Sequence, residues 1–163
     1  MPSAKKNSKK SSHKKQAKPS VDLAAMHPED LIEKAALVAL NSRFHAHSPY
    51  SKVKVGAAVI STSGKIYPGC NVENSSYGGT ICAERTAICS AVAAEGKKFE
   101  ILAIVVATDA SPPWPPCGIC RQVIAEFGGP NTPIIDINPK GKKLKFRLKD
   151  LLPQAFTSKH LKK

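Results

Sequence analysis

The sequence predicts an α/β protein, a three-layer α/β/α sandwich built on a five-stranded mixed sheet. Short alternating or continuous apolar runs have the length of strands, and longer segments repeat their apolar residues with the period of a helix. The elements follow in the order α-β-β-α-β-α-β-β, which fits a sheet covered by helices on both faces. With 163 residues, the chain is long enough for one such domain with a real core.

The first helix is expected to begin near His27 and to end around His45 to Ser48. Pro28 suits the first helical position, and the two acidic residues after it lie where the helix dipole favours negative charge. An apolar stripe then runs along the segment. Pro49 follows the predicted end, as expected of a residue that cannot continue a helix.

A hairpin and a second helix come next. Val53–Ile60 alternates and then becomes apolar, and Lys65–Val72 returns as its partner across a turn at Ser61–Gly64. The second helix is expected to begin at Cys82 and to stop at Gly96, a residue that suits a helix C-terminus.

The second half of the chain continues with strands and helices. Ile101–Thr108 is a continuous apolar run, typical of a central strand covered on both faces. A stiff proline-rich loop then leads into the next helix. The remaining predicted elements are this helix at Cys117–Phe127, strands at Pro133–Asn138 and Lys143–Leu148, and a short helix at Lys149–Phe156.

The net charge of +13 is concentrated at the two ends of the chain. The first 20 residues carry seven lysines and no acidic residue, and they lack apolar side chains to bury. We therefore predict a disordered lysine-rich tail at residues 1–26 and a catalytic domain at residues 27–163. Three roles stay open for the tail: a solvated segment, a non-specific nucleic-acid contact in which lysines release counterions from phosphates, or a targeting segment without the apolar region that secretion requires.

Cysteine usage and hydropathy indicate the compartment. Five cysteines, an odd number without a secretory signal ahead of them, favour a reducing compartment over a disulfide framework. No apolar run approaches the roughly 20 residues that a membrane-spanning helix needs. We expect a cytoplasmic protein without a membrane segment.

Cys82, Cys117 and Cys120 have the spacing of ligands for a catalytic zinc ion. Three soft protein ligands leave the fourth tetrahedral position open to water, whose pKa the ion lowers. Glu84 follows Cys82 by two positions and, on a helix opened by Cys82, reaches the open side of the ion without binding it. It is the candidate general base and acid, which takes a proton from this water and passes it to the substrate.

The alternative is a structural four-cysteine site with Cys70 or Cys89 as its fourth ligand. Cys89 lies two helical turns, roughly 10 Å, from Cys82, which is too far for a shared ion. Cys70 stays open as a ligand, although its apolar neighbours suggest a buried strand thiol. We interpret His45 and His47 as exposed polar residues at a helix end rather than as ligands.

Both groups of cysteines are predicted at helix N-termini, where the helix dipole and free amide groups stabilise thiolates. Three thiolates around Zn²⁺ leave a net negative charge, which opposes ionisation of the bound water. Arg85 and Arg121 are each adjacent to a ligand region, so they are candidate hydrogen-bond donors behind the ligands. The alternative for each is a surface salt bridge.

These motifs resemble those of the small, homotetrameric cytidine deaminases over roughly residues 28–160. The matching segments are spread through the domain: Pro49–Ser51, Val55–Ala58, Gly69–Asn74, Cys82–Ala87, Pro116–Gln122 and Leu151–Phe156. Three cysteines with a glutamate that is not a ligand also form one of the known arrangements of zinc deaminases. The resemblance implies a cytidine deaminase-like fold.

The resemblance also implies an activity, the hydrolytic deamination of cytidine and deoxycytidine to uridine and deoxyuridine in pyrimidine salvage, with one zinc ion per subunit. Asn71 and Glu73 match the family's ribose-binding pair. Glu84 would also hold the N3 edge of the pyrimidine. The backbone of Ala83 and the carbonyl of Pro115 would contact the base and its amino group.

A homotetramer with shared active sites is a further implication. Tyr50, Ser75, Tyr77 and Phe156 match positions that complete a neighbouring subunit's pocket, so an isolated subunit should be inactive.

One position departs from the family pattern. Val53 stands where relatives commonly place a phenylalanine against the pyrimidine, so stacking at that wall should be weaker by on the order of 1 kcal/mol. Trp114, in the proline-rich loop, either compensates for this loss or is a plain hydrophobic plug.

The sequence is also compatible with two other functions. A deaminase of RNA or single-stranded DNA would use the basic termini to attract the strand, although Glu73 would repel a phosphate and favours a free nucleoside. A basic binding protein with a structural zinc ion would have no catalysis, and Glu84→Gln would then change nothing measurable.

Overall fold

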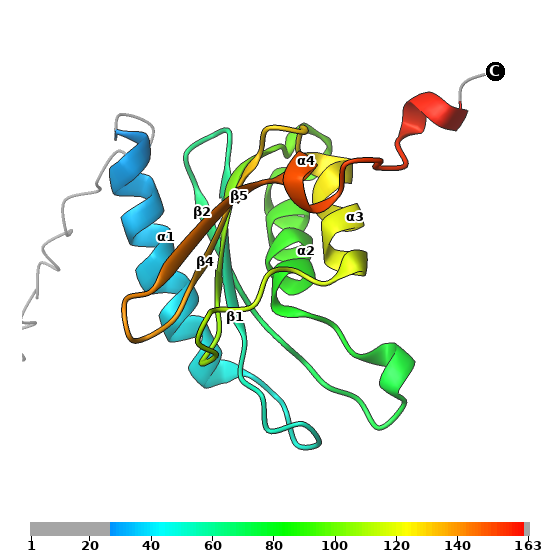
Figure 1. The fold of residues 1–163 in the computed structure, drawn as a ribbon. Coiled ribbons are helices and arrows are strands. Elements are labelled where there is room, and N and C mark those ends of the chain that lie inside the picture. The colour runs from blue at the N-terminus through cyan, green and yellow to red at the C-terminus, as the bar shows by residue number, and fades with distance from the viewer. Residues whose placement is uncertain (1–26, 162–163) are drawn as a thin grey trace, which may run out of the picture.

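Three layers make up residues 27–161, the part of the chain that the computed structural model describes (Figure 1). Helix α1 (Pro28–Ser42) lies on one face of a sheet, and helices α2 (Ala83–Glu95) and α3 (Gly118–Phe127) lie on the other. The remaining elements are β1 (Gly56–Ser61), β2 (Ile66–Cys70), β3 (Ile101–Ala107), β4 (Pro133–Ile137), β5 (Lys143–Arg147) and α4 (Leu148–Leu151). The tail predicted at residues 1–26 lies outside the described residues.

The strands of the described sheet follow the order β2-β1-β3-β4-β5. β1 pairs antiparallel with β2 and β3, β3 pairs parallel with β4, and β4 pairs antiparallel with β5. Helix α3 connects the two parallel strands, because parallel neighbours need a crossover between them. The predicted five-stranded mixed sheet with helices on both faces is confirmed.

The sheet separates two apolar cores, because successive residues of a strand point to opposite faces. In β3, Ile104 and Val106 pack toward α2 and α3, whereas Ala103 and Val105 pack toward α1. The edge strand β5 instead alternates between exposed and half-buried residues. The continuous apolar run at 101–108 therefore marks a central strand, as the sequence predicts.

Helix α2 lies close against β2, and a glycine makes this possible. A Cβ atom at Gly69 would lie 2.3 Å from the backbone oxygen of Ala83, so a larger residue would push the helix away. The helix begins after Cys82, its N-cap residue, and ends at Gly96, whose φ of 65° favours glycine. The close contact sets how near Cys82 lies to the sheet.

Two predicted boundaries differ from the structure. The hairpin strands are shorter, because the side chain of Asn71 hydrogen-bonds to the backbone of Val53 and Val55 where the ladder was expected to continue. The last predicted helix ends at Leu151 and does not reach residue 156. Pro153 explains the early end, since it has no N–H and restricts the residue before it.

Short 3₁₀ segments complete the described secondary structure: Arg43–His45, Tyr77–Gly79, Gly96–Lys98 and Ser158–Leu161. The first extends α1 to His45, within the predicted limits of that helix. None of the helices described between residues 27 and 161 has the length and apolar character needed to cross a membrane.

Candidate active site

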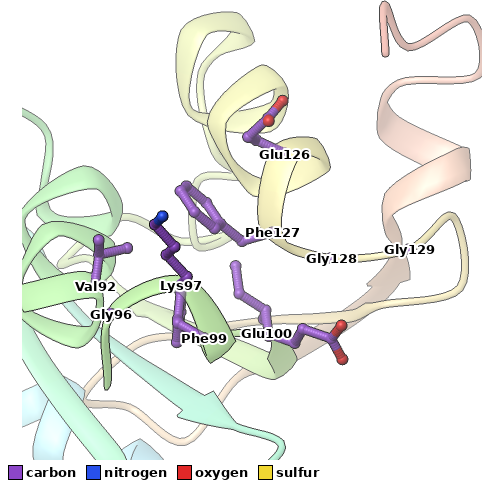
Figure 2. A pocket seen from close by; sticks show the side chains of 10 residues that line it. Val92, Gly96, Lys97, Phe99, Glu100, Glu126, Phe127, Gly128 and Gly129 are labelled. Atoms are coloured by element: carbon purple, nitrogen blue, oxygen red, sulfur yellow. The ribbon is translucent and has the colours of Figure 1, made fainter. Parts of the chain in front are cut away.

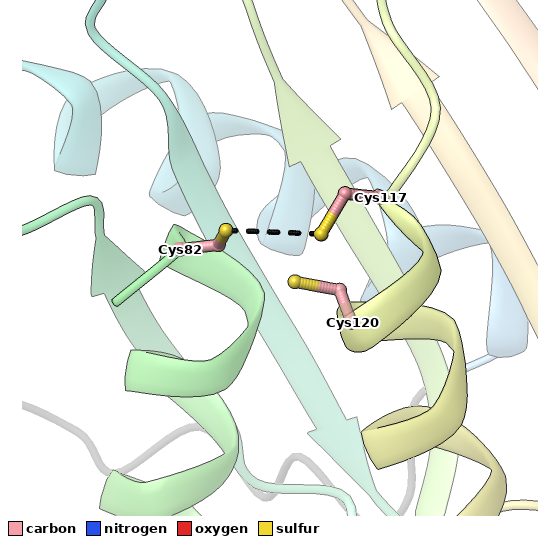
Figure 3. Close-up of side chains that lie close together, drawn as sticks. All are labelled: Cys82, Cys117 and Cys120. Atoms are coloured by element: carbon pink, nitrogen blue, oxygen red, sulfur yellow. Dashed lines mark hydrogen bonds between the residues drawn. The ribbon is translucent and has the colours of Figure 1, made fainter. Parts of the chain in front are cut away.

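Three cysteine side chains meet where the N-termini of α2 and α3 come together (Figure 3). Cys82 is the N-cap residue of α2, Cys117 is the N-cap residue of α3, and Cys120 lies in the first turn of α3. The three Sγ atoms lie within 4.8 Å of one another, and those of Cys82 and Cys117 are 3.9 Å apart. Tetrahedral zinc with Zn–S bonds of about 2.3 Å needs sulfur atoms roughly 3.8 Å apart, so these three donors fit a zinc ion.

The other candidate ligands do not join this cluster. Cys70 lies in β2, where burial raises the pKa of its thiol, and Cys89 is exposed further along α2. His45 and His47 are both exposed. Among the described residues, the cluster that can hold a metal ion contains Cys82, Cys117 and Cys120 alone, so the geometry does not support the four-cysteine alternative.

Arg85 supports the negative charge of the cluster. Hydrogen bonds from Cys120 first, and then from Arg85, lower the pKa of the Cys82 thiol to about 5. The hydrogen bond that the Cys120 thiol donates to Cys82, together with burial, raises the pKa of Cys120. Nη2 of Arg85 lies 3.7 Å from the Cys82 sulfur and donates to the carbonyl of Thr80 at 2.8 Å. The Thr80 carbonyl therefore holds the guanidinium beside the thiolate.

Arg121 makes different contacts. Its Nε donates to the carbonyl of Pro116 at 2.7 Å, and its Nη1 donates to the carbonyl of Leu151 at 3.0 Å. These bonds connect α3 to the residue before Cys117 and to the end of α4. Arg121 thus fixes the backbone beside the cysteines, whereas Arg85 contacts a sulfur.

Glu84 occupies the second position of α2 and is only 4% exposed. Burial raises the pKa of its carboxyl, and the negative charge of Cys82 raises it further. The residue lines the same cavity as Cys82 and Cys117. A buried carboxyl with a raised pKa at the wall of a cavity is typical of a group that exchanges protons during catalysis.

This cavity has a volume of about 350 Å³, within the range of small-molecule sites. Besides Glu84 and the two cysteines, most of its wall is apolar. The other lining residues are Ser51, Val53, Val55, Asn71, Thr80, Ala83, Val106, Thr108, Trp114 and Pro115.

A larger hollow of about 800 Å³ lies at the opposite, C-terminal ends of α2 and α3 (Figure 2). Its charged lining residues are Lys97, Glu100 and Glu126, all of them exposed. Its wall contains neither a cysteine nor a histidine among the described residues. The residues suited to catalysis therefore gather at the smaller cavity.

A family model described as the cytidine and deoxycytidylate deaminase zinc-binding region matches residues 29–135. The match covers more than half of the chain, and it includes Glu84 and all three cysteines of the cluster. This chain belongs to that deaminase family. The predictions of the family and of a zinc cofactor are confirmed.

Members of the deaminase family are similar to this chain over most of its length. The cytidine deaminase of Sporosarcina psychrophila is 45% identical over 130 residues, which are 80% of this chain and 94% of that protein. The probable cytidine deaminase of Dictyostelium discoideum is 44% identical over 137 residues, 83% of this chain and 90% of that protein. The crystal structure of cytidine deaminase from Burkholderia pseudomallei, at 44% identity, gives a TM-score of 0.70 and covers 80% of this chain and 100% of its own.

The cavity of this deaminase contains several of the predicted substrate contacts. Val53, Ala83 and Pro115 all line it. Asn71 is buried in its wall, where Oδ1 accepts the N–H of Val55 at 2.8 Å and Nδ2 donates to the carbonyl of Val53 at 2.9 Å. One amide side chain thus fixes the backbone that carries part of the wall.

Glu73, the other predicted sugar contact, lies in an adjoining cavity of about 390 Å³ with Tyr50 and Tyr77. Ser51 and Thr80 line both cavities. The carboxylate of Glu73 accepts the Ser51 hydroxyl and, at 2.9 Å, the backbone N–H of Tyr50. The Ser51 hydrogen bond is the main reason that the pKa of Glu73 is lowered.

Ser75 and Phe156 do not line the deaminase cavity in the single chain. Ser75 is exposed in the loop before Tyr77. Phe156 is 56% exposed, and its ring stacks on His160 with centroids 5.4 Å apart. Both side chains therefore lie outside the lining of the subunit's own cavity.

Sequence reasoning missed Thr80 and Asp136. The sequence carries no signal for Thr80, because its backbone carbonyl, and not its side chain, accepts the hydrogen bond from Arg85. Asp136 in β4 is fully buried, and neither of its carboxylate oxygens has a hydrogen-bond partner within residues 27–161. Burial, and next the charge of Glu84, raise its pKa to about 7. The sequence does carry a signal for Asp136, because it is the one acidic residue in an otherwise apolar strand.

Proposed function

We propose that the chain is a zinc-dependent cytidine deaminase, which hydrolyses cytidine and deoxycytidine to uridine and deoxyuridine and releases ammonia. The observation that carries the proposal is Glu84, a buried carboxyl with a raised pKa that shares one cavity with the cysteine cluster. Cys82, Cys117 and Cys120 would hold a zinc ion, which would act as a Lewis acid and activate water for attack on C4. Free nucleosides as substrates fit a role in cytoplasmic pyrimidine salvage.

Glu84 is the group that moves protons in this reaction. Its raised pKa makes the carboxylate a stronger base, which takes a proton from the attacking water and gives it to N3 of the pyrimidine. The same carboxylate then takes the second proton of the attacking water from the oxygen on C4 and delivers it to the departing amino group, so that C4 becomes a carbonyl and ammonia leaves. Burial keeps the transferred proton away from bulk water.

The walls of the cavity orient the nucleoside. The backbone of Ala83 and the carbonyl of Pro115 hold the base and its amino group. Asn71 and Glu73 bind the sugar hydroxyls, and the lowered pKa of Glu73 keeps it an ionised acceptor. Asn71 also fixes the wall at Val53 through its hydrogen bond to that carbonyl.

The same proposal includes a homotetramer with shared active sites. Tyr50, Tyr77 and Phe156 expose 48%, 76% and 56% of their surfaces, and exposed aromatic residues are enriched where subunits meet. Ser75, two residues before Tyr77, is exposed as well. These four side chains would complete the cavity of a neighbouring subunit.

The test compares Glu84→Gln with Glu95→Gln, the same substitution at the two ends of one helix. The fall in ultraviolet absorbance on mixing with cytidine measures turnover, and metal analysis measures bound zinc. Glu84→Gln should retain zinc and lose turnover by about 10²–10⁴-fold, because it removes the proton carrier. Glu95→Gln should turn over like the wild type. No turnover by folded, zinc-replete wild type, or equal turnover by Glu84→Gln, would contradict the proposal.

A further inference from the structure

Among residues 27–161, Trp114 is the single aromatic side chain that lines the cavity of the cysteine cluster. The rest of the described wall consists of aliphatic, small polar and ligand side chains. A planar pyrimidine that enters this cavity has two flat faces to bury. Aromatic rings bury such faces best, because stacking adds to the gain from burial alone.

The backbone around Trp114 is held rigidly. The N–H of Trp114 donates to the hydroxyl of Thr108 at 3.1 Å, and Thr108 is buried at the end of β3. Pro113 and Pro116, on either side, are among the fully buried residues. Fixed prolines and one anchored amide set the position of the indole before any ligand binds, which lowers the entropy lost on binding.

The indole itself is not used for packing the subunit's core. Trp114 remains 53% exposed, and Pro115 after it is also exposed, although Pro113 directly before it and Pro116 two positions after it are buried. A plain hydrophobic plug would bury its ring among core residues. A ring that is rigidly mounted, half exposed and part of a cavity wall has the features of a ligand-stacking residue.

We propose that Trp114 stacks on the pyrimidine ring of the substrate and is a specificity-determining residue for bases of this size and shape. This inference rests on the proposed function for the identity of the ligand. Val53, a small aliphatic residue of the same cavity, leaves Trp114 as the aromatic side chain of the same subunit that can contact the base.

The chain offers a direct probe, because Trp114 is its only tryptophan. Cytidine titrated into zinc-loaded Glu84→Gln protein should change the tryptophan fluorescence in a saturable way without turnover. Ribose, which has no base, should leave the fluorescence unchanged. Binding of cytidine measured by calorimetry without any change in this fluorescence would overturn the proposal.

Two variants separate aromatic stacking from apolar filling. Trp114→Leu keeps an apolar side chain and should raise KM for cytidine about 10-fold with little change in kcat, since stacking on a base is worth about 1–3 kcal/mol. Trp114→Phe keeps a ring and should stay within about threefold of the wild type. Equal KM values for the leucine variant and the wild type would overturn the proposal.

Oligomer size is measured for each variant by sedimentation. If Trp114→Leu dissociates the assembly, the indole is a subunit contact and the proposal is wrong. Absence of cytidine turnover in the wild type would instead contradict the proposed function. The fluorescence titration would still show whether a base stacks on Trp114, so the two failures are distinguishable.

Discussion

The two ends of helix α2 each carry a glutamate, and the two carboxyls have opposite surroundings. Glu84, at the N-terminal end, is buried, and burial raises its pKa. Glu95, at the C-terminal end, accepts the hydroxyls of Ser61 at 2.9 Å, Ser63 at 2.6 Å and Tyr67 at 2.8 Å. These hydrogen bonds, with Ser63 first, lower the pKa of Glu95.

The contrast continues in the groups near each end. Close to Glu84, the buried Nε of Arg85 and both oxygens of Asp136 have no hydrogen-bond partner among the described residues. A buried polar group without a partner costs about 1–3 kcal/mol, and the fold tolerates this cost where protons and a metal ion are handled. The Glu95 end binds the β1–β2 hairpin to the helix. One end of α2 is arranged for chemistry and the other for stability.

Substitution of Glu84 and of Glu95 should have different effects on the free energy of unfolding, and this is the largest difference that we expect between the two ends of α2. Glu95→Gln should lower the free energy of unfolding by about 1–3 kcal/mol, because it removes the charge that strengthens three hydrogen bonds. Glu84→Gln should leave this free energy unchanged or raise it, because it removes a carboxyl that is costly to bury. Urea unfolding followed by circular dichroism measures both.

Tyr67→Phe is the matched control for the stability effect. It removes one of the three hydroxyls and should cost about 0.5–1.5 kcal/mol, less than the loss of the carboxylate. If Glu84→Gln proved the more destabilising of the two glutamate variants, the assignment of stability to the Glu95 end would be wrong.

Arg85→Met should weaken zinc binding by about 10–100-fold, the usual cost of removing a donor behind a metal ligand. The variant loses the guanidinium beside the Cys82 sulfur but keeps an unbranched side chain. Competition with a chelator measures the affinity. Arg121→Met is the control, because Arg121 donates to carbonyls and not to a sulfur. Equal losses for both variants would refute the specific role of Arg85.

Asp136→Asn should remove a pH dependence of stability. The pKa of Asp136 is raised from 3.8 to about 7 by burial and then by Glu84, while Arg121 acts to lower it. Between these values the folded protein keeps a proton that the unfolded chain releases, so the free energy of unfolding falls as pH rises. Between about pH 5.5 and about pH 8 the free energy of unfolding should fall by about 2 kcal/mol, because one pKa unit of difference between the folded and unfolded states corresponds to about 1.4 kcal/mol.

Urea unfolding of the wild type and Asp136→Asn at several pH values in this range measures the effect. The wild type should lose about 2 kcal/mol relative to the variant as pH rises. The range stays above the acidic pH at which thiolates release zinc. A difference between the two proteins that stays constant with pH would show that Asp136 does not titrate there.

Local patterns predicted most of the elements and the candidate ligands. A continuous apolar run identified β3, and cysteines before two helical patterns identified the metal cluster, because N-cap position and strand burial are encoded by neighbouring residues. Residues 149–156 were predicted wrongly as one helix, since the restriction from Pro153 outweighed the apolar pattern. The resemblance of the motifs added Asn71 and Glu73, which composition alone would assign to a turn.

The sequence by itself therefore determined the order of strands and helices, the deaminase motifs and the residues available to a zinc ion. Only the tertiary structure decided that Glu84 is buried, that the Thr80 carbonyl holds Arg85 and that the Asp136 carboxylate has no hydrogen-bond partner in the described part of the chain. The physical reason is the range of the interactions. Caps and periodicity act within a few residues, whereas burial and the pKa of a carboxyl depend on elements that are far apart in the chain and meet only in the folded domain.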